Sequence, residues 1–369
     1  MMLNATQKNN LSIVKKPYEK GDEKHIIALF EKVFGKTMGK TESEQHWRWE
    51  ILGNPVKPVS TMLAWHGQRL IAQYAVNPIE FWIQGKEFTA ALSLDTMTDG
   101  DYGGKGIFQQ TAKLLYSEIT ERGISFIYGF PNSKSVRGFL KYLDWQIIVP
   151  PPILIRPLDI GPLVKNKTKS ARLGILASKI SKPVLGTMHR FMSDNSNISI
   201  RKENSFDVWA DELWQKCRDQ HKLWIVRDYK YLSWRYDIRP ESQYSLFTAW
   251  LHDKIMGYII TTSQNRNEGR VSFILDIVAV MDVNGVVEKL LNAVINMCIE
   301  NNDALISAMV MPASVYRKAF NKFFFIPLPK RLFPQEINFG GRLLNNKISK
   351  ELFYNPASWY ISWGDTDLL

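Results

Sequence analysis

The sequence predicts a mixed α/β protein built from two similar halves. Its 369 residues exceed the size of one ordinary domain. A content of 45% hydrophobic and 22% charged residues is typical of a globular chain and excludes a disordered or fibrous one. The two halves also repeat one order of helical and strand-like segments. Because the chain has only two cysteines, we expect neither a disulfide framework nor a Cys-based zinc site.

An internal repeat is the first evidence for two halves. Three stretches match in the same order at offsets of 187, 184 and 181 residues, as loop deletions in the second copy would produce. The matches are marked by the pairs Trp47 and Trp234, Ile71 and Ile255, and Asp95 and Asp276. The Trp47–Trp49 cluster offers rings for stacking on a sugar, but 12 tryptophans in the chain favour a core role.

Each half shows the same succession of periodicities. Apolar residues at three- and four-residue spacing predict helices, and alternating or short apolar runs predict strands. In the first half we expect a helix at 23–34, strands at 59–67, 69–84 and 88–98, a helix at 107–123, and a strand at 125–130. In the second half the counterparts are 207–217, 245–252, 254–263, 269–280, 285–302 and 304–310. A further helix follows the proline after each last strand, which completes one mixed α/β domain per half.

The charge places a linker between the halves. Residues 1–150 carry 18 basic and 15 acidic side chains, and residues 201–369 carry 21 and 19. Residues 151–200 carry eight basic side chains against two acidic ones, between a proline cluster and the polar run at 193–197. We therefore expect domains at 1–150 and 201–369 joined by a basic linker at 151–200. Since both halves are nearly neutral, nucleic acid is not an expected partner.

The linker pattern predicts an amphipathic helix at 171–192, which Pro183 should interrupt. Its apolar side comprises Leu173, Leu176, Ile180 and Val184, and basic residues lie elsewhere on it. Two interpretations remain open: the apolar side packs on the protein's own domains, or it lies on an anionic membrane surface. The chain start lacks the apolar region of a signal peptide. We expect a cytoplasmic protein, and the second interpretation of the helix would make it peripheral at the inner face of the membrane.

A glycine-rich loop is the strongest chemical signal. The strand ending at Thr98 runs through DGDYGGKG into a helix, with glycines at 103, 104 and 106. A flexible loop before unpaired helical N–H groups suits a pyrophosphate, although a plain turn is the alternative. The loop lacks the endings of a Walker A motif and of a dinucleotide fingerprint. At an offset of 181, Gly285 stands for Gly104 and Val287 for Gly106, so we expect the second half to have lost phosphate binding.

The segments DTMTDGDYGGKGIF at 95–108 and FIYGFPNSKSVRGFLKYLDW at 126–145 resemble the GNAT family of acyl-CoA-dependent N-acyltransferases. The resemblance implies acetyl-CoA as acyl donor, an amine as acceptor, and no metal. It also assigns a cofactor site in which strand-end residues bind the pantetheine arm, loop amides hold the pyrophosphate, and an asparagine follows. These residues are Thr96, Met97 and Thr98, then Gly103, Gly104, Lys105, Gly106, Ile107 and Phe108, and finally Asn132. Gly103 replaces the family's Arg or Gln, and the negative charges of Asp99 and Asp101 disfavour phosphate there.

The sequence offers candidates for the catalytic base and acid. Asp95 is the candidate base or amine anchor, but its repeat partner Asp276 in the second half also allows a structural role. Leu140 occupies the position at which the family has a tyrosine that acts as the acid. Tyr142 and Tyr128 are nearby substitutes, and a role in the core is the alternative for each. Six scattered histidines show no metal-ligand spacing.

These observations predict an N-acetyltransferase that is catalytic in its first half. The ending WYISWGDTDLL resembles that of bacterial tandem GNAT proteins found with surface-carbohydrate enzymes, which suggests an amino sugar as acceptor. One alternative is a FemABX-like transferase, which would take its acyl group from charged tRNA. Another is a non-catalytic binding module of the same fold.

Overall fold

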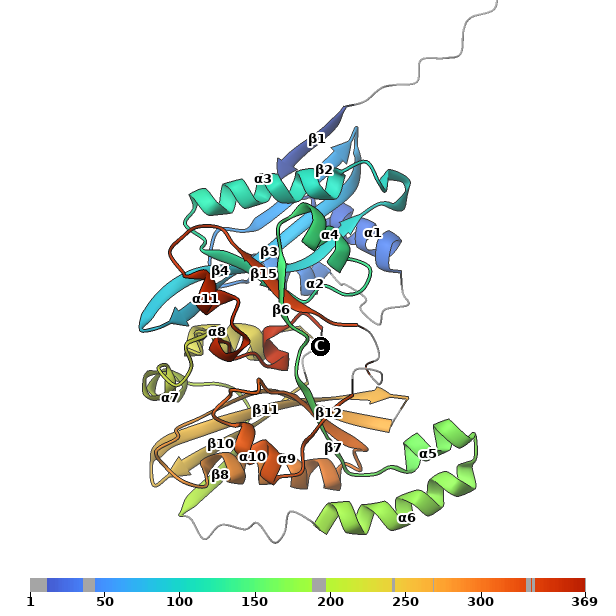
Figure 1. The fold of residues 1–369 in the computed structure, drawn as a ribbon, viewed down its shortest axis with the longest axis vertical. Coiled ribbons are helices and arrows are strands. Elements are labelled where there is room, and N and C mark those ends of the chain that lie inside the picture. The colour runs from blue at the N-terminus through green and yellow to red at the C-terminus, as the bar shows by residue number, and fades with distance from the viewer. Residues whose placement is uncertain are drawn as a thin grey trace, which may run out of the picture.

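The computed structural model of the protein describes residues 12–35, 44–187, 197–240, 243–267, 269–329, 333 and 336–368. Two β-sheets lie one below the other along the long axis, each with helices packed on it (Figure 1). Most of the polar run at 193–197 falls outside the described residues. Within the described parts of the chain, no helix combines the length and apolar character needed to cross a membrane.

The first sheet has the order β1-β2-β3-β4-β5-β15-β6, and a short strand, β9, pairs with β3. Its pairs are antiparallel except for β4 with β5. The strands are β1 (Ile13–Pro17), β2 (Ser60–His66), β3 (Arg69–Ile83), β4 (Lys86–Thr98), β5 (Phe126–Gly129), β6 (Gln146–Val149), β9 (Leu223–Ile225) and β15 (Phe339–Leu343).

The second sheet repeats this plan in the order β8-β10-β11-β12-β13-β7-β14, with β12 and β13 as its parallel pair. Its strands are β7 (Ile153–Pro157), β8 (Ile198–Glu203), β10 (Ser245–Leu251), β11 (Lys254–Arg266), β12 (Gly269–Ala279), β13 (Leu305–Met309) and β14 (Ile326–Pro327). The expected strands of both halves are present within a few residues of their predicted bounds. The predicted mixed α/β fold is therefore confirmed.

The helices follow the predicted order as well. In the first half they are α1 (Glu23–Phe34), α2 (Glu44–Trp47), the π-helix η2 (Arg48–Leu52), the short 3-10 turn η3 (Gly100–Tyr102), α3 (Ile107–Glu121) and α4 (Val136–Tyr142). Later in the chain come α7 (Trp209–Cys217), α8 (Tyr229–Leu232), the π-helix η5 (Ser233–Asp237), α9 (Val286–Glu300), α10 (Arg317–Lys322), α11 (Lys350–Phe353), and the 3-10 turns η7 (Pro356–Ser358) and η8 (Trp363–Asp365). The apolar side of α3 is buried on β2 and β3, and α9 covers β10 and β11 in the same way.

Each sheet also contains strands from outside its own half, which the expected boundaries did not anticipate. β9, from the second half, pairs with β3 of the first sheet. β7, from the segment expected to be a linker, lies between β13 and β14 of the second sheet. In return β15, from the second half, lies between β5 and β6 of the first sheet. The sheets therefore do not follow the expected domain boundaries at residues 150 and 200. The five-residue strands β7 and β15 pair with strands distant in the sequence, and local periodicity does not encode such pairing.

A tryptophan pair joins the halves. Trp49 in η2 and Trp234 in η5 stack with ring centroids 5.5 Å apart. Each indole N–H donates to the other residue's backbone carbonyl oxygen, at 2.7 and 3.1 Å. The two helical units therefore correspond at an offset of 185, which pairs Trp49 with Trp234 in place of the expected Trp47. Both Trp47 and Trp49 are buried, so the core interpretation of this cluster is correct.

A helical hairpin projects beside the second sheet (Figure 1). It consists of α5 (Gly161–Thr168) and α6 (Ala171–Thr187), joined at Lys169 in a left-handed backbone conformation. The expected interruption at Pro183 is wrong, because α6 continues through it. Pro183 is solvent-exposed, as is Lys179 one turn earlier, so water can replace the lost helical hydrogen bond.

Candidate functional site

The free end of β4 is the centre of the candidate site. β4 pairs with β5 only at residues 91–93 but continues to Thr98, while β5 ends at Gly129. On its other edge, β4 stays paired with β3 as far as Thr98. The predicted pantetheine-binding residues Thr96, Met97 and Thr98 all lie in this overhang. Their strand edge toward β5 has no strand partner in the described structure, which leaves backbone groups available to an extended ligand.

Asp95 lies at an irregularity of this strand. In the ladder between β3 and β4, Ala75 pairs with Leu94 and the next paired residues are Gln73 and Met97. Two residues of β4 therefore face a single residue of β3 between these pairs, which is a β-bulge. Asp95 adopts a φ of 40°, which is uncommon for a residue other than glycine. The Gln73 side-chain amide donates to its carbonyl oxygen at 3.2 Å. Bulges redirect side chains beside active sites, and the Asp95 side chain is only half-buried.

The glycine loop leads into α3 as the sequence indicated. Gly104 and Gly106 have φ values of 74° and 72°, in the left-handed region that favours glycine. Gly106 is the N-cap of the 15-residue helix α3, and no side chain caps the helix. The first turn contains no acidic residue, and residues 103–106 are exposed. Uncapped N–H groups and the positive end of the helix dipole thus face solvent directly after β4.

The acidic residues of the loop are neutralised. The Asp99 carboxylate accepts hydrogen bonds from Lys32 on α1, at 2.7 and 2.9 Å, and from Arg69 on β3. The same two cations contact Asp101 at 3.1 and 3.0 Å. Burial alone would raise the pKa of Asp99, but the bonds from Lys32, the Asp101 N–H and Arg69 outweigh it and lower that pKa. These carboxylates therefore hold the loop, and their repulsion of a phosphate is weaker than the sequence suggested.

The remaining predicted residues have other surroundings. The Asn132 side-chain oxygen accepts from the N–H groups of Lys134 and Ser135, so it caps the turn before α4. Tyr142 ends α4 with an exposed side chain, and the Lys141 ammonium lies 5.1 Å from its ring centroid. Tyr128 is fully buried among aromatic rings, as its core interpretation expected.

The Phe108 ring also packs within the fold. It lies 5.9 Å from Tyr74 and 5.5 Å from Phe139, centroid to centroid. This contact joins the start of α3 to α4 and leaves the Phe108 backbone in the first turn of α3.

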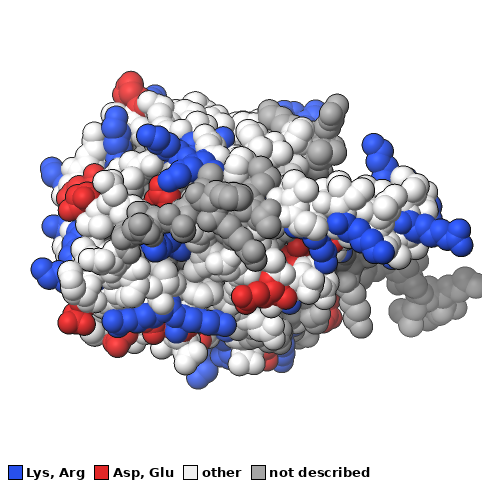
Figure 2. All heavy atoms as spheres, turned by 90° about the horizontal axis from the view of Figure 1, so that it is seen from below, with Lys and Arg blue, Asp and Glu red and all other residues white. Residues whose placement is uncertain are grey.

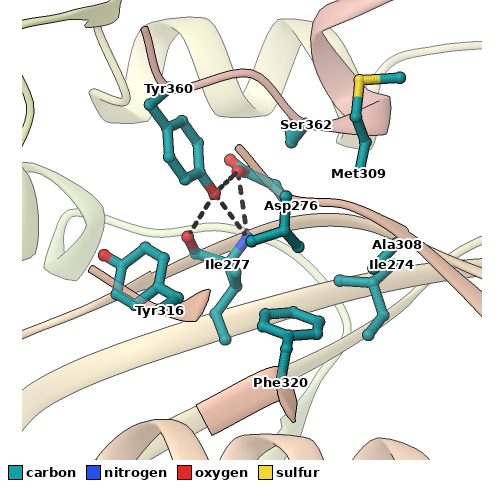
Figure 3. Close-up of a pocket in the computed structure, with 10 residues that line it drawn as sticks. Ile274, Asp276, Ile277, Ala308, Met309, Tyr316, Phe320, Tyr360 and Ser362 are labelled. Atoms are coloured by element: carbon teal, nitrogen blue, oxygen red, sulfur yellow. Dashed lines mark hydrogen bonds between the residues drawn. The ribbon is translucent and has the colours of Figure 1, made fainter. Parts of the chain in front are cut away.

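The equivalent place in the second half is occupied by the chain itself. β12 pairs with β13 only as far as Ile274 and continues to Ala279, and a small pocket lies between them (Figure 3). The Tyr360 hydroxyl donates to the Ile277 carbonyl oxygen at 2.7 Å. The Tyr316 hydroxyl accepts from the Ala279 N–H at 3.1 Å and lies 3.3 Å from its carbonyl oxygen. Two tyrosines thus hold the backbone groups that an extended ligand would need.

Asp276, the repeat partner of Asp95, is part of a buried network. Its carboxylate accepts from Arg227 and Tyr258, both at 2.8 Å, and lies 2.9 Å from the Tyr360 hydroxyl. Arg227 also contacts the buried Asp365. Asp276 is therefore structural in the second half, whereas the half-buried Asp95 lies in different surroundings.

The structure also corrects the register of the two glycine loops. Gly285 is the N-cap of α9 with a φ of 88°, so its counterpart is Gly106, and the expected pairings of Gly285 with Gly104 and of Val287 with Gly106 are wrong. The loop before α9 is shorter, and Glu288 lies in its first turn. The second half therefore differs from the first by loop length, this carboxylate and the two tyrosines, while both loops keep the N-cap glycine.

Sequence reasoning missed two further residues. Tyr316 is the residue before α10, four positions after Pro312, and Ser135 is the residue before α4, four positions after Pro131. Ser135 and Tyr316 are 181 positions apart, so the repeat already aligned them. The difference between serine and tyrosine at this aligned position was the signal that could have identified them. Among the described residues, no group of three or more His, Cys, Asp or Glu side chains is placed to hold a metal ion.

Comparison with known proteins gives one family match. Residues 15–148 match the family described as acetyltransferase (GNAT) domain. No curated protein matches the sequence.

Among solved structures, the chain is similar to a GCN5-related N-acetyltransferase from Anabaena variabilis, with 14% identity and a TM-score of 0.64, covering 90% of this chain and 73% of that one. It is also similar to Saccharomyces cerevisiae N-myristoyltransferase with bound myristoyl-CoA, with 12% identity and a TM-score of 0.59 over 89% and 78% of the chains. A probable N-acyltransferase from Enterococcus faecalis has 12% identity and a TM-score of 0.61 over 90% and 73%. These likenesses show a shared fold across both halves.

Proposed function

We propose that the first half of the protein transfers an acetyl group from acetyl-CoA to an amine. The observation that carries this proposal is the contrast between the two strand overhangs. In the first half, the free edge of β4 leads directly to an exposed glycine loop and an uncapped helix start. In the second half, Tyr316 and Tyr360 fill the matching position. The match of residues 15–148 to the acetyltransferase (GNAT) domain supports the same half as the site.

In this proposal the pantetheine arm lies along Thr96, Met97 and Thr98, and the pyrophosphate lies against the amides of residues 103–108. A thioester carbonyl beside the bulge at Asp95 would then face the free strand edge. The amine nitrogen bonds to the carbonyl carbon, the carbon–sulfur bond breaks, and CoA leaves as a thiolate that takes up a proton. Asp95 is our candidate for receiving the amine proton or holding the amine. Tyr142 is the candidate proton donor.

Binding of CoA to the whole chain tests the site directly. Lys105→Glu places a negative charge in the exposed loop, where Lys105 lies 3.4 Å from the Asp101 carbonyl oxygen and 4.7 Å from the centroid of the Tyr102 ring. We expect about tenfold weaker CoA binding by isothermal titration, the effect of one charge-assisted hydrogen bond. Lys113→Glu is the matched control, because it makes the same charge change at an exposed position further along α3. Equal affinity in both variants would place the CoA site elsewhere.

Turnover then tests the reaction and its acceptor. Acetyl-CoA consumption is measured with a panel of amines in which amino sugars are the first class. Asp95→Asn should lower the rate while leaving CoA affinity unchanged, since the pantetheine contacts are made by backbone groups. A full rate in this variant would exclude Asp95 as the base. A protein that binds tRNA in a salt-dependent way but does not bind CoA would instead favour aminoacyl transfer.

A further inference from the structure

The α5–α6 hairpin has its apolar side turned away from the protein. The side of α6 that packs on α5 and on the base of the hairpin consists of small residues, Gly174, Ser178 and Ser181. A side chain at Gly174 would come within 2.7 Å of the Lys165 Cβ, so the two helices approach closely there. Ser178 donates to the Asp159 carboxylate at 2.8 Å. The hairpin is therefore held by its small and polar residues.

The opposite side of α6 forms an aliphatic stripe that is open to solvent. One helical side carries four aliphatic residues with 49–63% of their surface exposed: Leu173, Leu176, Ile180 and Val184. Ile175 on α6 and Leu163 on α5 are exposed as well, at 59% and 41%. Among the described residues, the apolar side of this helix is therefore not packed on the protein's own domains. An aliphatic surface of this kind on a single hairpin indicates that something else covers it.

Basic side chains surround the stripe. Figure 2 shows the projecting arm with Lys and Arg side chains between stretches of uncharged surface. The exposed cations of the hairpin are Lys165, Lys167, Lys169, Arg172, Lys179 and Lys182. Its base has one acidic residue, Asp159, which is buried and bonded to Ser178 and Gly161. The exposed surface of the hairpin thus combines aliphatic groups with positive charge and carries no exposed acidic side chain among residues 159–187.

We propose that the α5–α6 hairpin docks on an anionic lipid surface, with the aliphatic stripe in the acyl region and the cations at the headgroups. This combination is the one that binds interfacial helices to anionic membranes. A nucleic acid would engage the cations and leave the aliphatic stripe in water. A second copy would bring two sets of six cations together, so a symmetric dimer through this surface is opposed by charge.

Vesicle co-sedimentation of the full chain tests the proposal. We expect binding to phosphatidylcholine vesicles that contain phosphatidylglycerol, weaker binding at high salt, and little binding to phosphatidylcholine alone. The double variant Leu176→Gln, Ile180→Gln should lower the partition coefficient at least tenfold. The matched control is Val208→Gln, Ile238→Gln, which removes two equally exposed aliphatic side chains, 70% and 60% exposed, outside the hairpin. This control should bind like the wild type.

The outcomes separate the possible occupants. Unchanged vesicle binding in the hairpin variant, or equal loss in the control, would overturn the proposal. A different result would also overturn it: the wild type is a dimer in size-exclusion chromatography and does not bind vesicles, and the hairpin variant is a monomer. The stripe would then be an interface between two copies of the chain. Circular dichroism and the melting temperature of the hairpin variant show whether it is folded. Because the hairpin contains none of the proposed acyl-CoA residues, failure of either proposal leaves the other standing.

Discussion

A tyrosine placed at Ser135 should close the site in the first half as Tyr316 closes the second. Both residues precede the helix that follows the last parallel strand. Tyr316 engages the backbone N–H and carbonyl of Ala279, the last residue of β12, and Thr98 is the last residue of β4. In Ser135→Tyr the new hydroxyl would therefore compete with the pantetheine arm for Thr98. Two backbone hydrogen bonds of about 1 kcal/mol each must then be broken by the ligand, which corresponds to about 30-fold weaker binding.

Isothermal titration of CoA into the folded protein measures this effect. The change also removes the weak contacts of the Ser135 hydroxyl with Asn132, at 3.2 and 3.4 Å, and Ser135→Ala isolates that loss. Ser135→Phe supplies the ring without the hydroxyl and separates steric closure from hydrogen bonding. Wild-type affinity in Ser135→Tyr, or an equal loss in Ser135→Ala, would refute the reasoning that the two overhangs are equivalent.

Three further changes probe the fold and the loop. Asp276→Ala removes a carboxylate from its buried pair with Arg227 and should cost about 3–5 kcal/mol in the free energy of unfolding, measured in urea. The pKa of Asp99 is lowered in the folded protein, so its ion pairs stabilise the protein above pH about 4. This stabilisation is lost as the pH falls through the folded pKa. Asp99→Asn should therefore make the melting temperature less dependent on pH in the acid range. Gly341→Val would clash with neighbouring backbone in the first sheet and lower the melting temperature by several degrees, whereas Gly186→Ala, with no atom within 4 Å of the added carbon, should not.

Local periodicity predicts the order of the elements in both halves, but it does not predict the placement of β7 in the second sheet and of β15 in the first. β15 reads FGGRL, and two adjacent glycines are poor evidence for a strand. The structure gives the physical reason: a side chain at Gly340 would come within 2.6 Å of the Gln146 carbonyl oxygen, and one at Gly341 would meet that of Ile127. The glycines that hide β15 from sequence analysis are what let it fit between β5 and β6.

The candidate site shows the same limit. The glycine loop and the start of α3 were predictable because they are contiguous in sequence. The neutralisation of Asp99 was not, because Lys32 and Arg69 come from an earlier helix and strand and meet it only after folding. The closure of the second site by Tyr360 was equally hidden, since that residue reaches Ile277 from 83 positions away. Sequence reasoning therefore located the loop, whereas tertiary contacts leave the strand end open in the first half and occupied by tyrosines in the second.

The exchange of β7 and β15 bears on how the protein is made. During synthesis, β6 leaves the ribosome while the position between β5 and β6 is still empty, because β15 begins at Phe339 and is the last of the described strands to be made. At translation rates of 5–20 residues per second, the roughly 190 residues between Val149 and Phe339 take about 10–40 s. Throughout that interval two strand edges of the first half are open to other chains. The nascent protein therefore has to be kept from aggregating until its last strand arrives.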